Sequence, residues 1–305
     1  ANVNPMNSDR DHANSAIYLI GGGIASLAAA AFLVRDGGIS GDHITILEES
    51  GKLGGSLDAT GSPDQGYVMR GGRMIESKYV CTYDLFSSIP TLEGHKSVTE
   101  EIFEWNEQLK TSSKARLFRD GHRINAPKFG LSERHILAIE RLGLQPELTL
   151  GRTSISDQFD SSFFTTDFWF MWCTTFAFQP WHSAVEFRRY LLRFTHMVSG
   201  FNTLGGLMRT VYNHYASMVR HLQKWLIEHG VRFVFDAHVT DLSFCHDSHG
   251  YIVDRIALER DSHKDEIRVA ATDYVFVTLG SMTEASSLGS MDSPPLLKSK
   301  QECGS

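Results

Sequence analysis

The chain has 305 residues, of which 42% are hydrophobic and 21% charged, and its formal net charge is -7. These values are typical of a globular chain with one large or two ordinary domains, and they exclude disordered, collagen-like and coiled-coil proteins. The acidic balance leaves no excess of Lys and Arg to neutralise phosphates, so no nucleic-acid partner is expected.

Cysteine spacing and hydropathy indicate the cellular compartment and bear on metal sites, disulfides and membrane spans. The cysteines are far apart and form no C-x-x-C pair: Cys81, Cys173, Cys245 and Cys303. This spacing predicts neither a metal site nor a disulfide framework, and it favours a reducing, cytoplasmic location. The polar first 14 residues contain no secretory signal. The most apolar stretch, 163–178, is too short to span a membrane, and we expect it to form an aromatic core or to line a substrate tunnel.

The first elements form a strand-turn-helix-strand pattern. The apolar run Ile17–Ile20 ends at three glycines and is followed by an alanine-rich helical pattern over 27–34. After a glycine pair at 37–38, a second strand is predicted over 43–47, ending at an acidic pair. The pattern indicates a βαβ unit within about 35 residues.

Later segments alternate between helical and strand patterns. Helices are predicted over 83–89, 100–109, 133–141 and 215–228, and strands over 231–235, 252–258 and 274–278. A capping box, Ser183 with Glu186, predicts a further helix start. The apolar face of that helix would carry residues 187, 191, 194 and 198, and Gly200 would end it.

A glycine motif stands at the first turn, Gly21-x-Gly23-x-x-Ser26. Its glycines permit a tight turn and close approach of a pyrophosphate to the backbone, and the small third residue lets helix and strand pack closely. Glu48, about 20 residues beyond the motif, can accept hydrogen bonds from ribose hydroxyls. This arrangement predicts a dinucleotide site.

Further glycines after the second strand favour FAD over NAD as the cofactor. Gly54, Gly55 and Ser56 follow the acidic pair, and residues 66–70 lead into a second glycine pair. Bare backbone at both places can lie against a large flat cofactor. We expect Arg70, Gly71, Gly72, Arg73 and Met74 to complete the FAD site.

Six segments resemble the oleate hydratases, also called myosin-cross-reactive antigens. The segments are AIYLIGGGIASLAAAAFLVRDG at 16–37, GGSLDATG and GYVMRGGR within 54–73, CTYDLFSSIPTLE at 81–93, FAFQPWHSAVEFRRYLLRF at 176–194 and YVFVTLGSMTE at 274–284. The resemblance implies a lyase that binds FAD and adds water to an isolated double bond of a long-chain unsaturated fatty acid such as oleate. Net hydration transfers no electrons, so FAD would be structural and electrostatic. Peripheral membrane contact to acquire the substrate is a further expectation.

The resemblance also implies site residues. Where the family commonly has a glutamate that activates water, this chain has Met74, as in an RGGRM-type branch, and methionine cannot act as a base. Glu76, two residues further on, is the candidate substitute. The family's proposed acid corresponds to Tyr190, whose ring we expect to be buried with its hydroxyl facing a cavity. Neighbouring basic residues receive no role, because such side chains are usually solvated: His182, Arg188, Arg193 and His196.

The predicted fold class is α/β, with a Rossmann-like FAD-binding domain and an α+β substrate domain that contains an aromatic-rich helical region. The expected segments are a polar arm over 1–15, FAD-binding portions over 16–110 and 215–284, a mostly helical substrate portion over 111–214 and a disordered polar tail over 285–305.

Family members are usually much longer, so the chain is expected to be a fragment or a short form. Two alternatives to a hydratase stay open. One is a non-catalytic FAD- or lipid-binding remnant, and the other is a redox flavoenzyme of amine-oxidase or desaturase type, since fold does not fix function.

Overall fold

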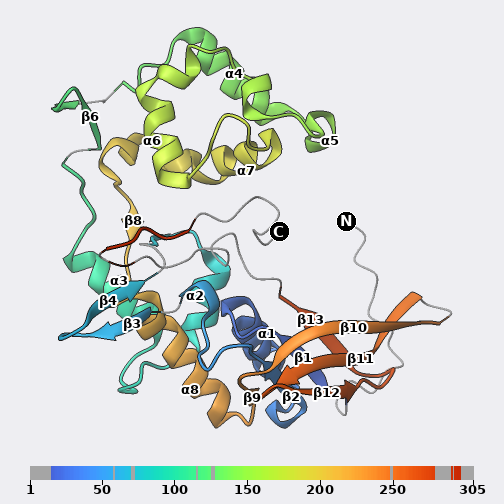
Figure 1. Cartoon of the computed structure of the whole chain (residues 1–305). Coiled ribbons are helices and arrows are strands. Elements are labelled where there is room, and N and C mark those ends of the chain that lie inside the picture. Colours follow the sequence, from blue (N-terminus) through green and yellow to red (C-terminus); the bar gives the residue numbers. More distant parts are fainter. Residues whose placement is uncertain are drawn as a thin grey trace. The chain divides into compact units, whose positions relative to one another are not determined.

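The chain forms two compact units in the computed structural model, which describes residues 15–57, 59–69, 73–114, 116–124, 128–247, 250–278, 290 and 292–296 (Figure 1). Unit 1 comprises Ala1–Met74, Lys78–Trp105 and Arg209–Ser305, and unit 2 comprises Ile75–Ser77 and Asn106–Met208. All of the predicted polar arm except Ser15, and most of the predicted tail, lie outside the described residues, as does Cys303.

Unit 1 is built on a four-stranded parallel sheet. In spatial order its strands are β13 (Tyr274–Val277), β1 (Ile17–Ile20), β2 (Ile44–Leu47) and β9 (Arg232–Val234). Every residue of β2 is buried, as is usual for an inner strand of a parallel sheet. The strands predicted at these four places are confirmed.

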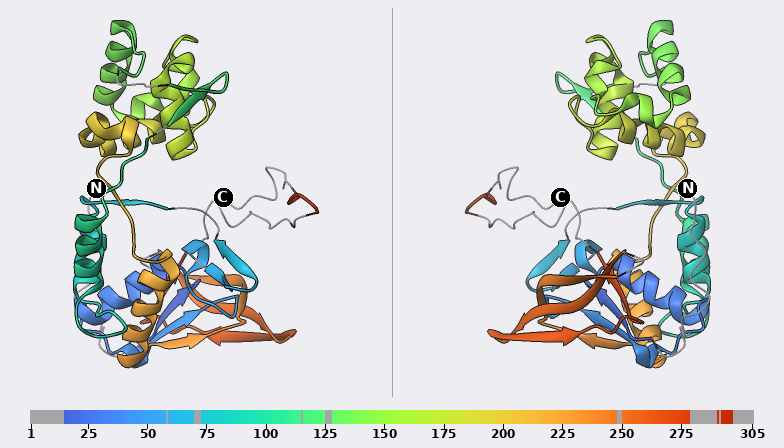
Figure 2. Two further views of the ribbon diagram at one scale, coloured as in Figure 1. Left: turned by 90° about the vertical axis from the view of Figure 1, so that its left-hand side faces the viewer. Right: turned by 90° about the vertical axis from the view of Figure 1, so that its right-hand side faces the viewer.

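The helices of unit 1 are α1 (Ile24–Arg35), α2 (Val80–Ser87), α8 (Arg220–Glu228) and α3 (Val98–Gln108), whose last residues belong to unit 2. The first helix packs on β1 and lies beside α8 (Figure 2). Its buried face is formed by small side chains and one leucine: Ser26, Leu27, Ala30 and Ala31. Small residues allow this close approach of helix and sheet.

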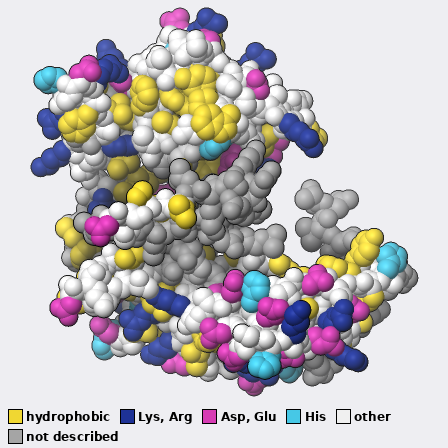
Figure 3. Space-filling model, in the orientation of Figure 1, with side chains coloured by type: hydrophobic (Ala, Val, Ile, Leu, Met, Phe, Trp, Pro, Cys, Tyr) yellow, Lys and Arg dark blue, Asp and Glu magenta, His cyan; other side chains and the backbone are white. Residues whose placement is uncertain are grey.

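Antiparallel strands complete unit 1. One sheet contains β10 (His238–Asp247), β11 (Gly250–Arg260) and β12 (His263–Arg268), and a hairpin pairs β3 (Ala59–Ser62) with β4 (Gly66–Met69). Figure 3 shows acidic, basic and histidine side chains interspersed in the region of the three-stranded sheet. Apolar residues of its other face pack on the parallel sheet. This division between a solvated and a buried face is usual for antiparallel sheets.

Unit 2 is mostly helical. Its helices are α4 (Glu133–Leu144), α5 (Glu147–Leu150), α6 (Asp167–Phe176) and α7 (Ala184–Phe194). Two small antiparallel pairs accompany them, β5 (Ile75–Glu76) with β8 (Leu207–Met208) and β6 (Leu117–Arg119) with β7 (His122–Ile124).

Short 3₁₀ and π helices join these elements. They are 3₁₀ helices over Gly41–His43, Gly55–Leu57, Ile155–Asp157, Phe163–Thr165 and Thr195–Thr203, and a π-helical turn over Tyr215–Val219 that leads into α8. The helix predicted over 215–228 therefore begins with a π turn. Together the two units give a mixed α/β fold, as predicted.

The predicted end of the helix that begins after Ser183 is wrong. Ser183 does cap this helix, accepting a hydrogen bond from the Glu186 backbone N–H, but α7 ends at Phe194 instead of continuing to Gly200. The Thr195 hydroxyl donates to the Leu191 carbonyl, which competes with regular helical bonding at this point. Gly200 has a packing role, because a Cβ there would lie 3.0 Å from the Gly205 carbonyl oxygen.

Aromatic side chains form the core of unit 2. Trp172 contacts Phe168, Phe187 and Phe201 with ring centroids 5.4–5.7 Å apart, and it is 1% exposed. The stretch 163–178 thus contributes to an aromatic core, which was one of its two predicted roles. Within the described part of the chain, no helix combines the length and apolarity needed to cross a membrane, and no acidic, histidine and cysteine side chains cluster as metal ligands would.

Candidate functional site

The two motif glycines of the β1–α1 turn differ in their structural role. Gly21 has φ +91°, and a Cβ at this position would lie 2.6 Å from Thr278 Oγ1. Gly23 has φ −72°, and a Cβ there would meet no atom within 4 Å. The fold therefore requires glycine at Gly21, whereas at Gly23 it leaves open space above the turn.

The N-terminus of α1 is suited to an anion. Gly23 is the N-cap, no side chain caps the helix, and the first turn carries no acidic residue. The exposed backbone N–H groups and the helix dipole favour negative charge at such an end. Ser26 is fully buried in this helix, 3.1 Å from Thr278 Oγ1, so it serves the close packing expected of the third motif position.

Glu48 is held against the same turn. Its Oε2 accepts a hydrogen bond from the Gly22 backbone N–H at 2.6 Å, and its Oε1 accepts from the N–H and hydroxyl of Ser50 at 2.9 and 2.7 Å. A carboxylate has about four acceptor positions, so one remains for a ribose hydroxyl.

The second glycine segment lies on the first. The Gly54 N–H donates to the Gly22 carbonyl at 2.9 Å, and a Cβ at Gly55 would lie 3.3 Å from the Gly23 Cα. Gly54 and Gly55 have φ values of +109° and +52°, a region that favours glycine. Residues that are 32 positions apart in sequence therefore share one backbone surface.

Arg73 and Ser56, both predicted to contact the cofactor, lie together, with the Arg73 Nη1 donating to Ser56 Oγ at 2.9 Å. Burial, together with the charge of Arg73, lowers the pKa of His214 below its usual 6.5. The Nε2 of His214 is buried without a hydrogen bond to any described residue. Met74 is 37% exposed. Arg70, Gly71 and Gly72 lie outside the described residues.

Unit 2 contains a buried carboxylate between two basic side chains. Glu76, on β5, is 1% exposed, and its carboxylate oxygens lie 3.3 Å from Arg193 Nη2 and 3.3 Å from His196 Nε2. Neither basic residue was predicted to have a role. No local pattern could have revealed this cluster, because Glu76 and His196 are 120 positions apart.

Tyr190 is half-buried on α7. Its ring contacts Phe176, Phe178 and Phe194 with centroids 5.1–5.9 Å apart. Its hydroxyl makes no hydrogen bond to a described residue, so it is free to bond to a ligand.

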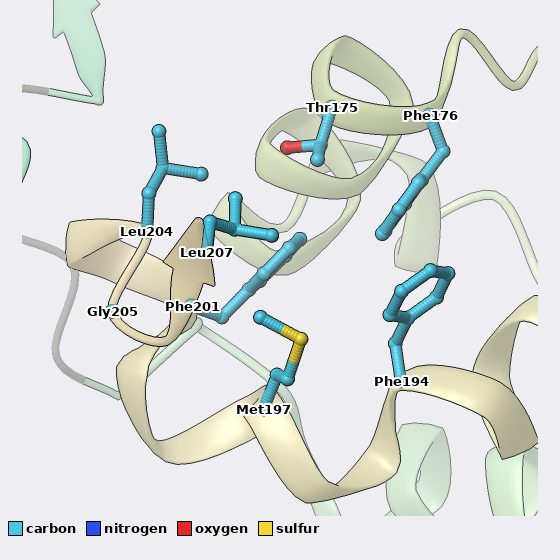
Figure 4. Close-up of a pocket in the computed structure, with 8 residues that line it drawn as sticks. All are labelled: Thr175, Phe176, Phe194, Met197, Phe201, Leu204, Gly205 and Leu207. Carbon is cyan, nitrogen blue, oxygen red and sulfur yellow. The ribbon is translucent and has the colours of Figure 1, made fainter. Parts of the chain in front are cut away.

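A small apolar cavity lies beside these rings (Figure 4). Its volume is about 20 Å³. It is lined by Thr175, Phe176, Phe194, Met197, Phe201, Leu204, Gly205 and Leu207, and thus not by Tyr190. Leu207 pairs with Glu76 across the β5–β8 ladder, and Met197 follows His196 in sequence. The cavity and the charged cluster are therefore formed by the same segments.

Comparison with known proteins identifies the family. The model of the MCRA family matches residues 14–305. The chain belongs to the MCRA family.

Curated relatives of this MCRA chain are fatty acid hydratases. It is 37% identical over 275 residues to the oleate hydratase of Streptococcus pyogenes serotype M49 (strain NZ131), covering 90% of the chain and 47% of that protein. It is 31% identical over 305 residues to the linoleate hydratase of Lactiplantibacillus plantarum, covering 92% of the chain and 54% of that protein. The chain therefore spans about half the length of these relatives.

A solved structure supports the fold of the MCRA chain. An oxidoreductase from Methanosarcina mazei matches with a TM-score of 0.51 and 13% identity, covering 88% of this chain and 60% of that one. At this level of identity the likeness concerns the mixed α/β fold alone.

Proposed function

We propose that this chain provides the FAD-binding and double-bond hydration chemistry of a fatty acid hydratase. The reaction adds water to an isolated cis double bond of a long-chain unsaturated fatty acid such as oleate and yields a hydroxy fatty acid. The proposal rests chiefly on the match of at least 90% of the chain to an oleate hydratase and a linoleate hydratase.

The parallel sheet of unit 1 supports a Rossmann-like dinucleotide site. Numbered by their order along the chain, its strands lie in the order 4-1-2-3, which read from the other edge is 3-2-1-4, the order of four adjacent strands in the doubly wound arrangement. Phosphates in such folds lie at the helix N-terminus that follows the first strand, which here is the uncapped end of α1.

The residues of unit 1 fit FAD. Gly21, Gly23 and the N-terminus of α1 would hold the pyrophosphate, Glu48 the ribose, and Gly54, Gly55, Ser56 and Arg73 the flavin side of the cofactor. The buried, unbonded Nε2 of His214 supports a polar ligand beside Arg73. Bound FAD would act as a structural and electrostatic element, without electron transfer.

Hydration of an alkene needs a proton donor and a proton acceptor. Protonation of one alkene carbon forms a C–H bond, and attack by water on the other carbon forms a C–O bond and releases one proton. In our proposal the Tyr190 hydroxyl donates the first proton as the alkene π bond breaks, and His196, oriented by Glu76, accepts the second; exchange through solvent then returns this proton to the Tyr190 phenolate. Met74 can neither donate nor accept a proton. In our proposal His196 and Glu76 therefore take the role of the glutamate that the family commonly has at that position.

Labelling with oxygen-18 water tests the function. The chain is incubated with oleate and FAD in oxygen-18 water, and the products are analysed by mass spectrometry. We expect a hydroxy acid that carries one heavy oxygen. Reduction of the flavin by substrate under anaerobic conditions would instead indicate a redox enzyme. Absence of any product, with FAD bound, would indicate a non-catalytic FAD- or lipid-binding protein.

Replacing His196 with Gln tests the base. This change leaves the ion pair of Glu76 with Arg193 in place, so we expect the melting temperature to stay within a few degrees of the original. Hydration should fall by about 100-fold or more, the usual contribution of a general base. His182→Gln, at a histidine outside the cluster, is the matched control. Full hydration by His196→Gln would exclude His196 as the base.

A further inference from the structure

Arg116 is a half-buried cation in unit 2, and among the described residues its hydrogen-bond partners are all neutral groups. Its Nη1 donates to the Phe201 carbonyl at 2.6 Å, and its Nη2 donates to Thr175 Oγ1 at 2.6 Å and to the Met171 carbonyl at 3.3 Å. A guanidinium has five N–H donors, so two of them bond to no described residue.

The charge of Arg116 is not balanced by an acid within the described residues, since no carboxylate lies within ion-pair distance. Two other arginines of this unit differ: Arg188 pairs with Glu147, and Arg193 pairs with Glu76. Burial lowers the pKa of Arg116, although a guanidinium remains charged at neutral pH. Burial removes part of the hydration of this charge, so an anionic group beside the guanidinium would be stabilised.

The apolar cavity of Figure 4 adjoins Arg116. Two of the groups that Arg116 contacts, Thr175 and Phe201, line the cavity, and the guanidinium also lies 5.4 Å from the centre of the Phe201 ring. The remaining wall is almost entirely apolar and includes Phe176, Phe194 and Met197. A cation beside an apolar pocket matches an anion that carries an apolar chain.

We propose that Arg116 binds the carboxylate of a long-chain fatty acid whose first carbons enter this cavity. The cavity, at about 20 Å³, has room for about one water, for which about 10–15 Å³ suffices, so a fatty acid chain enters only as wall side chains move. Met197 is a wall side chain that can move in this way, because it is unbranched and has three rotatable bonds. The identity of the ligand as the substrate rests on the proposed function, whereas the anion site rests on the geometry of Arg116.

Paired probes with and without a charge test the site. Arg116→Met is titrated with oleate and with oleyl alcohol, which has the same chain and a neutral head group. We expect oleate binding to weaken by roughly 10- to 100-fold, the effect of losing a charge-assisted hydrogen bond, and oleyl alcohol binding to stay within about two-fold. Arg123→Met, which removes an exposed arginine of the adjacent strand β7, should change neither affinity.

Equal weakening of both probes would show that Arg116 only supports the cavity wall, and unchanged oleate binding would equally overturn the proposal. If Arg116→Met does not fold, Arg116→Lys keeps the charge but loses the forked donors, and it should weaken oleate alone. If the unsubstituted chain does not hydrate oleate although its oleate binding depends on Arg116, the proposed function is overturned and the anion site stands. If the unsubstituted chain hydrates oleate but Arg116→Met weakens oleate and oleyl alcohol binding equally, the anion site is overturned and the proposed function stands.

Discussion

Gly23→Val is expected to abolish FAD binding while leaving unit 1 folded. The φ of −72° at Gly23 is open to valine, and a Cβ would meet no protein atom within 4 Å. The side chain would therefore project into the space where a pyrophosphate is expected over the α1 N-terminus. We expect FAD affinity to fall by about 100-fold or more, equivalent to about 2.7 kcal/mol. Titration of FAD fluorescence measures the affinity.

Stability without FAD separates this effect from unfolding. Valine is a poorer N-cap than glycine, so Gly23→Val should cost only about 1 kcal/mol. Gly21→Ala is the matched variant: its φ of +91° and the 2.6 Å approach to Thr278 Oγ1 should lower the melting temperature even in the absence of FAD. If Gly23→Val binds FAD as tightly as the original chain, the turn is not the pyrophosphate site.

The motif itself could not distinguish these two glycines. Sequence spacing treats Gly21 and Gly23 as equivalent parts of one pattern, and it correctly predicts the strand, turn and helix around them. Their separate roles depend on β13, because Thr278 at its end fills the space beside Gly21 and not beside Gly23. That strand lies more than 250 positions away, and only the folded sheet brings it there.

Hydrophobic periodicity predicted the buried strands and missed the polar ones. The β2 strand, ITIL, is mostly apolar and buried throughout, and it was expected, whereas β12, HKDEIR, is almost wholly exposed and was not. Its extended conformation comes from pairing with β11, which provides the backbone hydrogen bonds. The pairing of β5 with β8, which carries Glu76 toward α7, also had no signal in the sequence, because strands of two residues are too short to show a periodicity.

The candidate site of unit 2 combines residues that were predicted from the sequence with residues that were not. Tyr190 and Glu76 were predicted through family resemblance, and this prediction remains to be tested. Arg116 and His196 gave no sequence signal, because an isolated arginine or histidine is usually solvated. Their importance follows from tertiary contacts: a carboxylate that is 1% exposed beside His196, and a guanidinium bonded to backbone carbonyls beside an aromatic cavity.

Tyr190→Phe is expected to stop hydration by removing the proton donor while keeping the aromatic packing. The contacts of the ring with Phe176, Phe178 and Phe194 do not involve the hydroxyl, and the hydroxyl makes no hydrogen bond to a described residue. Its loss should therefore leave the melting temperature unchanged. The rate of oxygen-18 incorporation should fall by about 10²- to 10⁴-fold, the range expected for a general acid.

Two measurements show whether this loss is chemical. FAD affinity and oleate affinity should both equal those of the original chain, since the aromatic ring stays in place and unit 1 is untouched. Tyr251→Phe, at a tyrosine that is 81% exposed on β11, is the control and should hydrate oleate normally. Full turnover by Tyr190→Phe would assign the proton donation to another group. A loss of oleate binding in Tyr190→Phe would instead give the hydroxyl a binding role, because a group that acts only in proton transfer leaves the ground-state affinity unchanged.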